Sequence, residues 1–529
     1  ERTACPMSKL RTLAVLLVVP ALTLASCSSD KTDNAGKNDN AGTSTTAPDT
    51  TGTTAPAADL AGKKRPDGPA AEVVKELTGG KGPALSDLTP PDLAGNGFVE
   101  HEFEVKGNAV SYKADGDLPA DGSWKLTEDA NADYRTRVVV RRPEKAADFN
   151  GTVVVEWLNV SGGLDANPDW TYLGDELLRG GYAWVGVSAQ RIGVEGGPVA
   201  VPVPVAAGMA GQGLKKMVPE RYGSLSHPGD AFAYDMYTQV GRAIRAGATG
   251  PGASTSLLGD LEPQVVLAAG ESQSAFMLTS YANGVQPLTQ EYDGFLIHSR
   301  GGGAGPLGTA GGSSDIASAI ATKPTKIRTD LDAPVIMLQS ESDVVGILGY
   351  YPARQDDTDL IRLWEVAGTS HVDEYMLGPI ANSMGCTGQI NAGPLHFVAK
   401  AAIRGLDQWA RTGEAPPKAA RMEVEDVGGK PAYKRSADGI VLGGIRTPQV
   451  DVPVSVLSGV PTTDASVICL LLGSTKPLPP ARIAELYPSK NSYEKAYGNS
   501  TDEAIAAGFV LKEDRKTMIA DADPAAIAR

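Results

Sequence analysis

Cysteine and histidine, the residues from which many metal centres are built, are scarce in this sequence. Among 529 residues there are 4 cysteines and 5 histidines. Cys5 precedes the expected start at Met7, and Cys27 belongs to an N-terminal signal described below. Neither Cys386 nor Cys469 has a further cysteine or histidine at metal-ligand spacing, so we predict no metal site. In an oxidising compartment this remaining pair is expected to form a disulfide, and two buried free thiols are the alternative.

Positive charge is also in deficit. The 48 lysines and arginines are outnumbered by 63 acidic residues, which gives a formal net charge of -15. This balance argues against nucleic acid or an anionic membrane surface as a partner. It is compatible with an enzyme that acts on small neutral or apolar substrates. Beyond the N-terminal segment, the sequence contains no apolar run of about 18 residues that could span a membrane.

The N-terminal segment has the pattern of an export signal. Lys9 and Arg11 precede an apolar run over residues 12–24, which is too short to span a membrane but is typical of a signal peptide. The next residues, Leu-Ala-Ser-Cys at 24–27, resemble a bacterial lipobox, in which the cysteine is acylated. We therefore predict a lipoprotein signal over residues 1–27 with Cys27 lipidated; an ordinary signal peptide is the alternative. The protein is then expected outside the cytoplasm, attached to the bacterial cell membrane through a lipid anchor only.

The rest of the chain divides by composition into a tether and a folded region. Residues 28–70 are small and polar, which predicts a disordered flexible linker. From about residue 95, short apolar runs are separated by helical patterns, which is typical of a mostly parallel sheet covered on both faces. The predicted strands are 98–110, 134–142, 152–158, 183–187, 265–269, 294–297, 335–338 and 361–366. The predicted helices include 232–246, 274–281 and 397–410. Two long loops, 190–227 and 299–331, would lie where such sheets bind ligands.

A serine follows the predicted strand 265–269 at a sharp turn. The sequence there is Gly-Glu-Ser-Gln-Ser-Ala at 270–275, and a helical pattern follows. A serine in this position is pushed out of the sheet beside a helix N-terminus, where negative charge is favoured. The pattern resembles the G-x-S-x-G nucleophile elbow, with Ser274 in place of the second glycine. We predict that Ser272 is a nucleophile; a serine with no role beyond the turn is the alternative.

A hydroxyl needs a base and an orienting acid to act as a nucleophile, and both follow in the order expected for such an elbow. The strand 335–338 leads to Asp343, the predicted acid, with Glu341 as the second choice. The strand 361–366 leads to His371, the predicted base, which lies 28 residues after Asp343. Of the other histidines, His227 and His298 could lie on the same side of the sheet, but capping or packing is the simpler interpretation for both.

These features together resemble the α/β-hydrolase superfamily. The segments 221–230 (RYGSLSHPGD), 362–371 (RLWEVAGTSH) and 443–453 (GGIRTPQVDVP) are similar to a poorly characterised branch known simply as alpha/beta hydrolase domain proteins. The likeness runs from about residue 95 to near the C-terminus. It implies an α/β-hydrolase fold, and oxyanion donors from the backbone N–H of Gln273 and of Asn159 or Val160.

The resemblance also implies a reaction. It is the hydrolysis of a small carboxylic ester by a serine hydrolase, through an acyl-enzyme on Ser272 and without metal or organic cofactor. An acyltransferase would use the same three residues, so the sequence does not separate the two activities. A binding lipoprotein on an inactive hydrolase scaffold is a third possibility, although such scaffolds usually lack one of the three residues, and all are present here.

The chain continues well beyond the predicted base. A hydrolase usually ends about one helix after its histidine, whereas 158 residues follow His371 here. Residues from about 415 therefore form a predicted C-terminal extension, and alternation over about 420–460 predicts added strands. A disulfide between Cys386 and Cys469 would attach this extension to the loop that follows His371.

Overall fold

A computed structural model describes residues 63–81, 85, 91–247, 256–315, 319–320, 322–460 and 466–528. The predicted signal segment 1–27, including Cys27, and most of the predicted linker 28–70 lie outside these residues. Near the end of that linker, Lys63 pairs with Asp332 at 2.8 Å, and Arg65 pairs with Asp293. All described residues belong to one compact unit, so the extension belongs to the same unit as the sheet.

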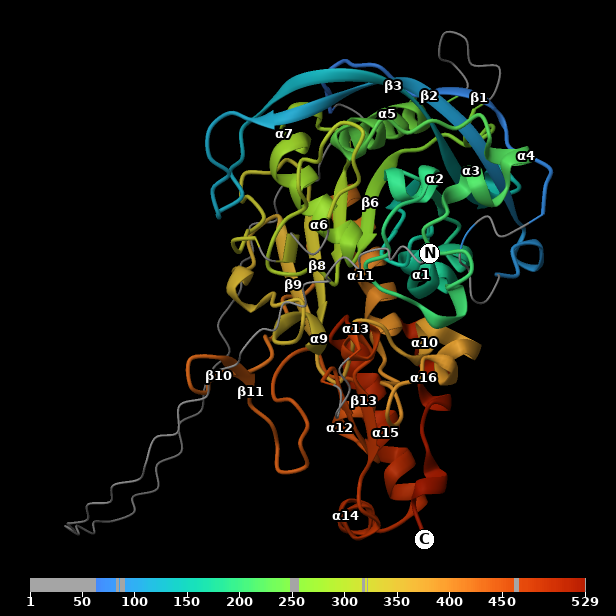
Figure 1. Ribbon diagram of the computed structural model, residues 1–529. Coiled ribbons are helices and arrows are strands. Elements are labelled where there is room, and N and C mark those ends of the chain that lie inside the picture. The colour runs from blue at the N-terminus through green and yellow to red at the C-terminus, as the bar shows by residue number, and fades with distance from the viewer. Residues whose placement is uncertain are drawn as a thin grey trace, which may run out of the picture. The chain divides into compact units, whose positions relative to one another are not determined.

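One nine-stranded sheet forms the centre of the fold (Figure 1). In spatial order its strands are β1 (Glu72–Glu76), β2 (Phe98–Ala114), β3 (Leu126–Pro143), β5 (Ala183–Val187), β4 (Thr152–Trp157), β6 (Val265–Glu271), β7 (Gly294–His298), β8 (Val335–Ser340) and β9 (Ile361–Val366). The pairs from β1 to β5 are antiparallel, and all pairs from β5 to β9 are parallel. Every residue of β4 to β9 is buried. These strands are mostly apolar because helices cover both faces, and the few polar residues within them, such as Glu156 and Glu365, are buried too.

Helices follow or precede most strands. The longer ones are α1 (Pro168–Arg179), α5 (Ala233–Ala246), α6 (Gln273–Ser280), α11 (Leu395–Thr412) and α15 (Lys490–Ala506). The shorter ones are α2 (Arg191–Glu195), α3 (Gly213–Met217), α4 (Pro219–Tyr222), α7 (Gln286–Thr289), α9 (Glu341–Val344), α10 (Glu374–Leu377), α12 (Pro448–Asp451), α13 (Val467–Leu471), α14 (Pro480–Leu486) and α16 (Arg515–Ala520). The predicted mostly parallel α/β sheet with covered faces is confirmed.

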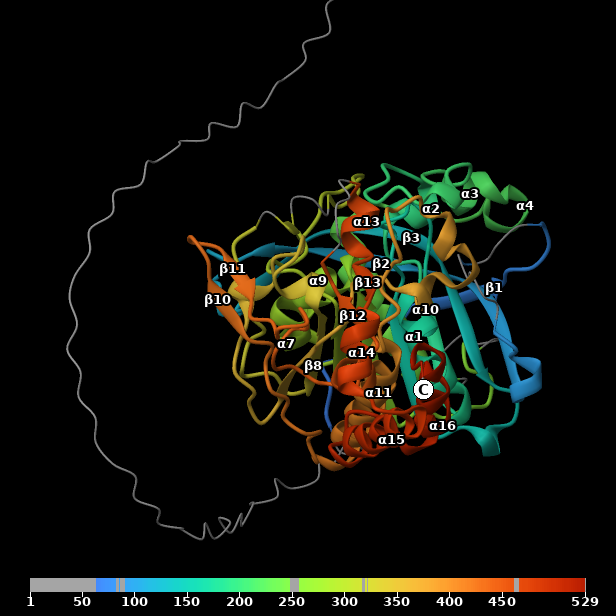
Figure 2. The same cartoon turned by 90° about the horizontal axis from the view of Figure 1, so that it is seen from below.

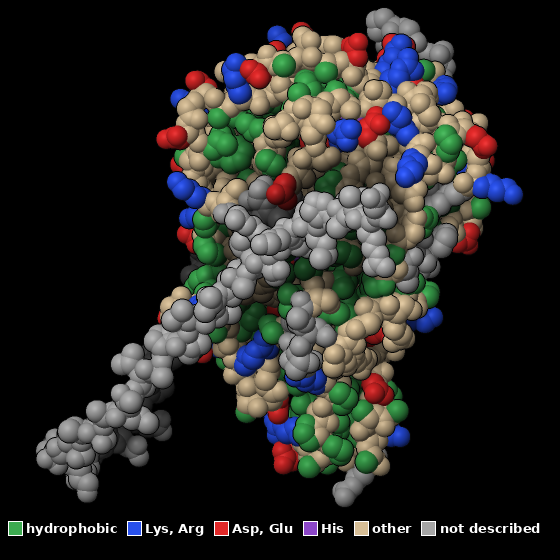
Figure 3. All heavy atoms as spheres, in the orientation of Figure 1, with side chains coloured by type: hydrophobic (Ala, Val, Ile, Leu, Met, Phe, Trp, Pro, Cys, Tyr) green, Lys and Arg blue, Asp and Glu red, His purple; other side chains and the backbone are tan. Residues whose placement is uncertain are grey.

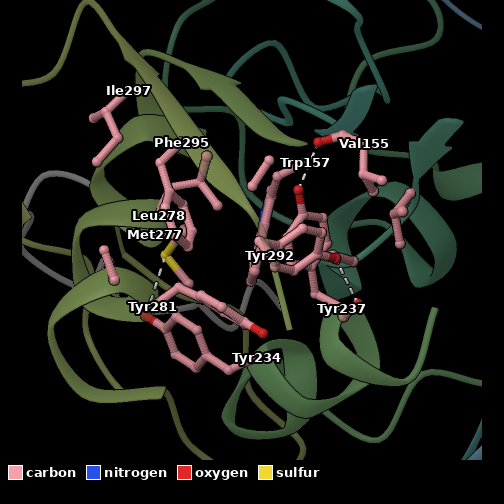
Figure 4. Packing of buried hydrophobic residues seen from close by; sticks show 14 of the residues in the cluster. Val155, Trp157, Tyr234, Tyr237, Met277, Leu278, Tyr281, Tyr292, Phe295 and Ile297 are labelled. Atoms are coloured by element: carbon pink, nitrogen blue, oxygen red, sulfur yellow. Dashed lines mark hydrogen bonds between the residues drawn. The ribbon is translucent and has the colours of Figure 1, made fainter. Parts of the chain in front are cut away.

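The two faces of the sheet have separate hydrophobic cores. On one face, alternate residues of the parallel strands pack against α5 and α6, and on the other face they pack against α1 and α11. Figure 4 shows the first core, where tyrosines surround Trp157. Their hydroxyl groups are satisfied: Tyr237 donates to the carbonyl of Val155 at 2.6 Å, and Tyr292 donates to the carbonyl of Tyr237 at 2.8 Å. This packing fixes α6 against β6, and it thereby fixes the position of Ser272, which lies between them.

Two parts of the chain differ from the predicted organisation. Strand β1 lies ahead of the expected boundary at residue 95, and it forms one edge of the sheet, where it pairs with β2. Its half-exposed residues give only a weak pattern in the sequence, because an edge strand needs little apolar surface. The segment 190–227, which was predicted to be a loop, contains the short helices α2, α3 and α4. Each of them spans only four or five residues.

The extension beyond α11 forms two small two-stranded antiparallel sheets and a helical region. One sheet pairs β10 (Val424–Asp426) with β11 (Pro431–Tyr433), and the other pairs β12 (Ser455–Ser458) with β13 (Ser474–Pro477). A small apolar core of its own lies between the helices α14 and α15 and the segments around them. The helices α14, α15 and α16 lie below the sheet as it is drawn in Figure 1, and they face the viewer in Figure 2. The added strands predicted over 420–460 are thus present, but in short two-stranded sheets outside the central sheet.

Charged groups of both signs are interspersed on the face shown in Figure 3. The excess of acidic residues is therefore spread among basic ones on this face, rather than gathered by itself. Within the described residues, no helix combines the length and the apolar character needed to cross a membrane.

Candidate active site

Ser272 lies at a sharp turn between β6 and α6. Its φ of 58° and ψ of -118° belong to a region that residues with a side chain rarely adopt, so the turn is strained. The turn also needs small neighbours: a Cβ atom on Gly270 would lie 3.0 Å from Cβ of Ser274 and 2.9 Å from Cδ1 of Leu278. Ser274 is fully buried at this contact. A serine in place of the second glycine therefore still permits the close packing of strand and helix.

Three predicted residues form one hydrogen-bonded chain. Oγ of Ser272 lies 2.8 Å from Nε2 of His371, and Nδ1 of His371 lies 2.7 Å from Oδ1 of Asp343. A carboxylate only accepts hydrogen bonds, so Nδ1 donates to Asp343 and Nε2 is left to accept the hydroxyl proton of Ser272. Each residue follows the carboxyl end of a different parallel strand, β6, β8 or β9, which brings residues 99 positions apart into contact. The arrangement can activate a serine hydroxyl as a nucleophile.

Asp343 is held in place by the first turn of α9. Its Oδ2 accepts hydrogen bonds from the backbone N–H and the hydroxyl of Ser340, at 2.6 and 2.8 Å. Ser340 in turn caps the same helix, so each residue fixes the other in a capping box. With Oδ2 occupied in this way, Oδ1 is directed at His371.

Glu341, the second choice for the acid, has a different set of partners. Its carboxylate accepts hydrogen bonds from the backbone N–H of Gly368 at 2.7 Å and of Gly459 at 3.0 Å. Gly368 precedes His371 in the same loop, and Gly459 belongs to the extension. Glu341 therefore joins the extension to the loop that carries His371, and the structure brings Asp343, not Glu341, to the imidazole.

The three residues predicted as oxyanion donors lie beside Ser272, but the structure corrects the prediction for two of them. The backbone N–H of Asn159 donates to the carbonyl of Ala166 at 2.9 Å, and that of Val160 donates to Oε1 of Gln273 at 3.0 Å. Both groups are engaged because the loop after β4 folds back on itself and onto α6. The backbone N–H of Gln273 has no acceptor among the described residues. It is therefore available beside Ser272 at the start of the helix.

The side chain of Asn159 is better placed than its backbone. Its Nδ2 donates to the carbonyl of Glu271 at 3.1 Å, and the residue lines the same pocket as Ser272. An amide nitrogen carries two hydrogens, so one remains for a further acceptor. The sequence identified this residue, but the structure is needed to choose the side chain over the backbone.

His227 and His298 belong to the buried framework. Nε2 of His227 lies 2.9 Å from the carbonyl oxygen of Ala189, and burial lowers the pKa of this histidine. Nδ1 of His298 lies 2.9 Å from Oδ1 of Asp169, and both side chains are fully buried. Both positions agree with the packing interpretation.

A predominantly apolar pocket of about 190 Å³ opens at Ser272 and His371. Its apolar lining residues are Leu164, Ala166, Val201, Val203, Ala206, Val372, Met376, Leu377, Ile380, Ile468 and Leu471. They come from the loop after β4, the segment after α2, the region from His371 through α10 and beyond, and α13 of the extension. The extension thus forms part of the pocket wall, which the sequence alone did not indicate.

The predicted disulfide between Cys386 and Cys469 is present and ties two parts of this wall together. Cys469 lies in α13 between Ile468 and Leu471, and Cys386 follows the 3₁₀ helix that contains Ile380. The bond joins positions 83 residues apart in the sequence. It therefore attaches the extension near the loop of His371, as expected.

The model of the alpha/beta hydrolase domain family matches residues 65–520. The chain belongs to this family. No curated protein matches its sequence. The match begins 30 residues before the predicted boundary at residue 95, in agreement with the position of β1.

Several solved structures show remote similarity to this alpha/beta hydrolase. One comes from work on two fungal esterases of Rhizomucor miehei, with 13% identity, a TM-score of 0.30, and coverage of 58% of this chain and 84% of the other. A serine hydrolase without a lid from Xanthomonas campestris has 13% identity, a TM-score of 0.26, and coverage of 53% and 97%. The esterase domain of a Rhodothermus marinus protein has 10% identity, a TM-score of 0.26, and coverage of 58% and 100%.

One acidic residue of this hydrolase was not among those predicted for the site. Glu271 directly precedes Ser272 and lines the pocket, and its Oε1 lies 3.3 Å from Nε2 of His371. Its place in the motif shows that it is near Ser272, but not that its side chain turns toward His371. Among the described residues, no group of three His, Cys, Asp or Glu side chains is arranged to bind a metal ion.

Proposed function

We propose that this alpha/beta hydrolase cleaves small carboxylic esters with an apolar acyl or alcohol part, through an acyl-enzyme on Ser272. One observation carries the proposal: the hydrogen-bonded chain from Asp343 through His371 to Ser272 ends at an apolar pocket. The chain supplies the nucleophile and the base, and the pocket favours an uncharged, apolar substrate. The reaction is proposed to take place outside the cytoplasm, on a lipid-anchored protein; the lipobox and the disulfide support this location.

In the first half of the reaction, Oγ of Ser272 attacks the ester carbonyl carbon while Nε2 of His371 takes the hydroxyl proton. Asp343 holds the imidazole and stabilises its charged form. The backbone N–H of Gln273 and the free hydrogen on Nδ2 of Asn159 stabilise the oxyanion. When the tetrahedral intermediate collapses, the imidazolium gives its proton to the leaving alcohol. In the second half, water cleaves the acyl-enzyme by the same steps.

We expect a fluorophosphonate probe to label the purified protein once, at Ser272. Such probes react with an activated serine and mimic the tetrahedral intermediate. Mass spectrometry of peptides should therefore find the adduct on the peptide that contains residues 270–275. Hydrolysis of p-nitrophenyl esters is measured in parallel. An unlabelled protein without esterase activity would contradict the proposed function and favour a binding protein.

The Cys386–Cys469 bond is expected to determine which esters the pocket accepts. Replacing both cysteines by serine frees α13 and its residues Ile468 and Leu471 from the opposite wall. We expect kcat/KM for p-nitrophenyl hexanoate to fall at least several-fold more than kcat/KM for p-nitrophenyl acetate. We also expect the free energy of unfolding to fall by about 2–4 kcal/mol. Kinetics over the ester series and thermal unfolding measure the two effects.

Reduction of the wild-type protein with dithiothreitol provides the control for the substitutions themselves. The reduced protein should show the same change in chain-length preference as the double variant. Equal losses for acetate and hexanoate would contradict the assignment of α13 to the substrate wall.

A further inference from the structure

The carboxyl group of Glu271 occupies an unusual position beside the base. It is 3% exposed, and among the described residues that line the pocket it is the only carboxyl group. Its Oε1 lies 3.3 Å from Nε2 of His371 but has no hydrogen-bond partner among the described residues. A buried acceptor without a partner costs about 1–3 kcal/mol, so its position calls for an explanation.

The surroundings of Glu271 favour its neutral form. Burial raises its pKa well above the usual range, and the nearby carboxylates of Asp169, Asp343 and Glu156 raise it further. An ionised carboxylate at this distance would attract the imidazolium form of His371 and hold the base in its protonated state. A neutral carboxyl group does not do so, but its carbonyl oxygen still accepts hydrogen bonds.

The need for such an acceptor arises once Ser272 is acylated. Its Oγ then has no proton to donate, and Nε2 of His371 must accept a hydrogen from the incoming water instead. A water molecule at hydrogen-bond distance from Nε2 can also reach Oε1 of Glu271, because the two atoms are only 3.3 Å apart. One water hydrogen then points to each atom, and an oxygen lone pair is left for the acyl carbon.

We propose that Glu271 binds the water molecule that cleaves the acyl-enzyme and holds it against Nε2 of His371. The inference rests on the proposed function. In the step itself, the water oxygen forms a bond to the acyl carbon, and one water proton passes to Nε2. The bond between the acyl carbon and Oγ of Ser272 then breaks, and Oγ takes the proton back from the imidazolium. Glu271 neither gains nor loses a proton.

The two half-reactions therefore depend on Glu271 to different degrees. In acylation the attacking hydroxyl is covalently fixed, and it already contacts Nε2 at 2.8 Å. In deacylation the attacking water is held only by hydrogen bonds. Methanol differs from water in a useful way, because its single hydroxyl hydrogen goes to Nε2 and none is left for Glu271.

The test compares Glu271→Leu, which keeps the approximate size of the side chain but removes its oxygens, with Glu271→Gln, which keeps an acceptor oxygen. Rapid mixing with p-nitrophenyl butyrate measures acylation from the initial release of p-nitrophenol. Intact-protein mass spectrometry measures the decay of the acyl-enzyme. For Glu271→Leu we expect acylation within about 3-fold of wild type and deacylation slowed roughly 10- to 100-fold, because the water loses a positioning contact. Glu271→Gln should lose much less.

Added methanol gives a second, independent readout. The ratio of methyl ester to acid at a fixed methanol concentration should rise about 10-fold in Glu271→Leu, since only the attack of water depends on the lost contact. Glu374→Gln, a change from carboxylate to amide at an exposed position three residues after His371, is the matched control and should behave as wild type.

Three outcomes separate the possibilities. Slow deacylation with a raised methanol ratio supports the water-binding role. Acylation and deacylation that fall together, or deacylation that stays unchanged, would overturn it. If Glu271→Leu fails to fold, Glu271→Ala is measured in the same way. If Ser272→Ala still hydrolyses esters, the proposed function fails. If Ser272→Ala is inactive but Glu271→Leu deacylates at the wild-type rate, only the inference about Glu271 is overturned.

Discussion

Replacement of Ser272 by alanine is expected to reduce kcat/KM for p-nitrophenyl butyrate by roughly 10⁴- to 10⁶-fold. The variant has no atom that can form the acyl bond, and any remaining rate comes from substrate binding and the oxyanion donors. Fluorophosphonate labelling should be lost completely. The effect is large because Ser272 and His371 act as one unit, with Oγ and Nε2 only 2.8 Å apart.

The fold of this variant should remain intact, and this needs to be measured. Ser272 has a strained backbone with φ of 58°, and alanine has the same intrinsic difficulty there, so we expect little change in thermal stability. Ser274→Ala is a useful control, because its side chain is buried next to the elbow but takes no part in the hydrogen-bonded chain. Persistent labelling in Ser272→Ala would show that another serine is the nucleophile.

Replacement of Asp343 by asparagine is expected to be the next most damaging change, with kcat reduced about 10⁴-fold. The amide group can donate to Nδ1 of His371, which would stabilise the wrong tautomer and place the proton on Nε2. The imidazole would then be unable to accept the proton of Ser272. The capping contacts with Ser340 limit the loss of stability, because an amide oxygen can still accept from Ser340. Kinetics of ester hydrolysis, together with thermal unfolding, separate the two effects.

Glu341→Gln provides the matched comparison, since it is the same chemical change two residues away. Glu341 accepts hydrogen bonds from Gly368 and Gly459 and does not reach His371. We therefore expect easier unfolding, by about 1–3 kcal/mol for a disturbed buried carboxylate, while kcat of the folded enzyme changes less than about 10-fold. A greater loss of kcat in Glu341→Gln than in Asp343→Asn would reverse the assignment of the acid.

The sequence alone was sufficient for the features that local patterns encode. The apolar strands β4 to β9, the turn at Ser272, and the order Ser272, Asp343, His371 along the chain all follow from short segments. Strand and turn signals are local because a buried parallel strand requires a continuous apolar run, and an elbow requires small residues beside it. Family membership follows from the same segments, and the match over residues 65–520 agrees.

Features that depend on contacts between distant segments required the tertiary structure. The sequence placed Asn159 and Val160 beside Ser272, but the availability of their N–H groups depends on Ala166 and Gln273, which accept from them. The choice between Asp343 and Glu341 likewise depends on Gly459, more than a hundred residues away, whose N–H binds the second carboxylate.

The extension and Glu271 show the same division. The sequence predicted an extension and its disulfide. It did not show that Ile468 and Leu471 line the pocket at Ser272, because that depends on how the extension folds back. Glu271 was visible in the motif, but the direction of its side chain toward His371 depends on the relative positions of β6 and β9. A pattern in the sequence determines which residues face the core of an element. Side-chain distances between elements are decided by packing, which is a property of the whole fold.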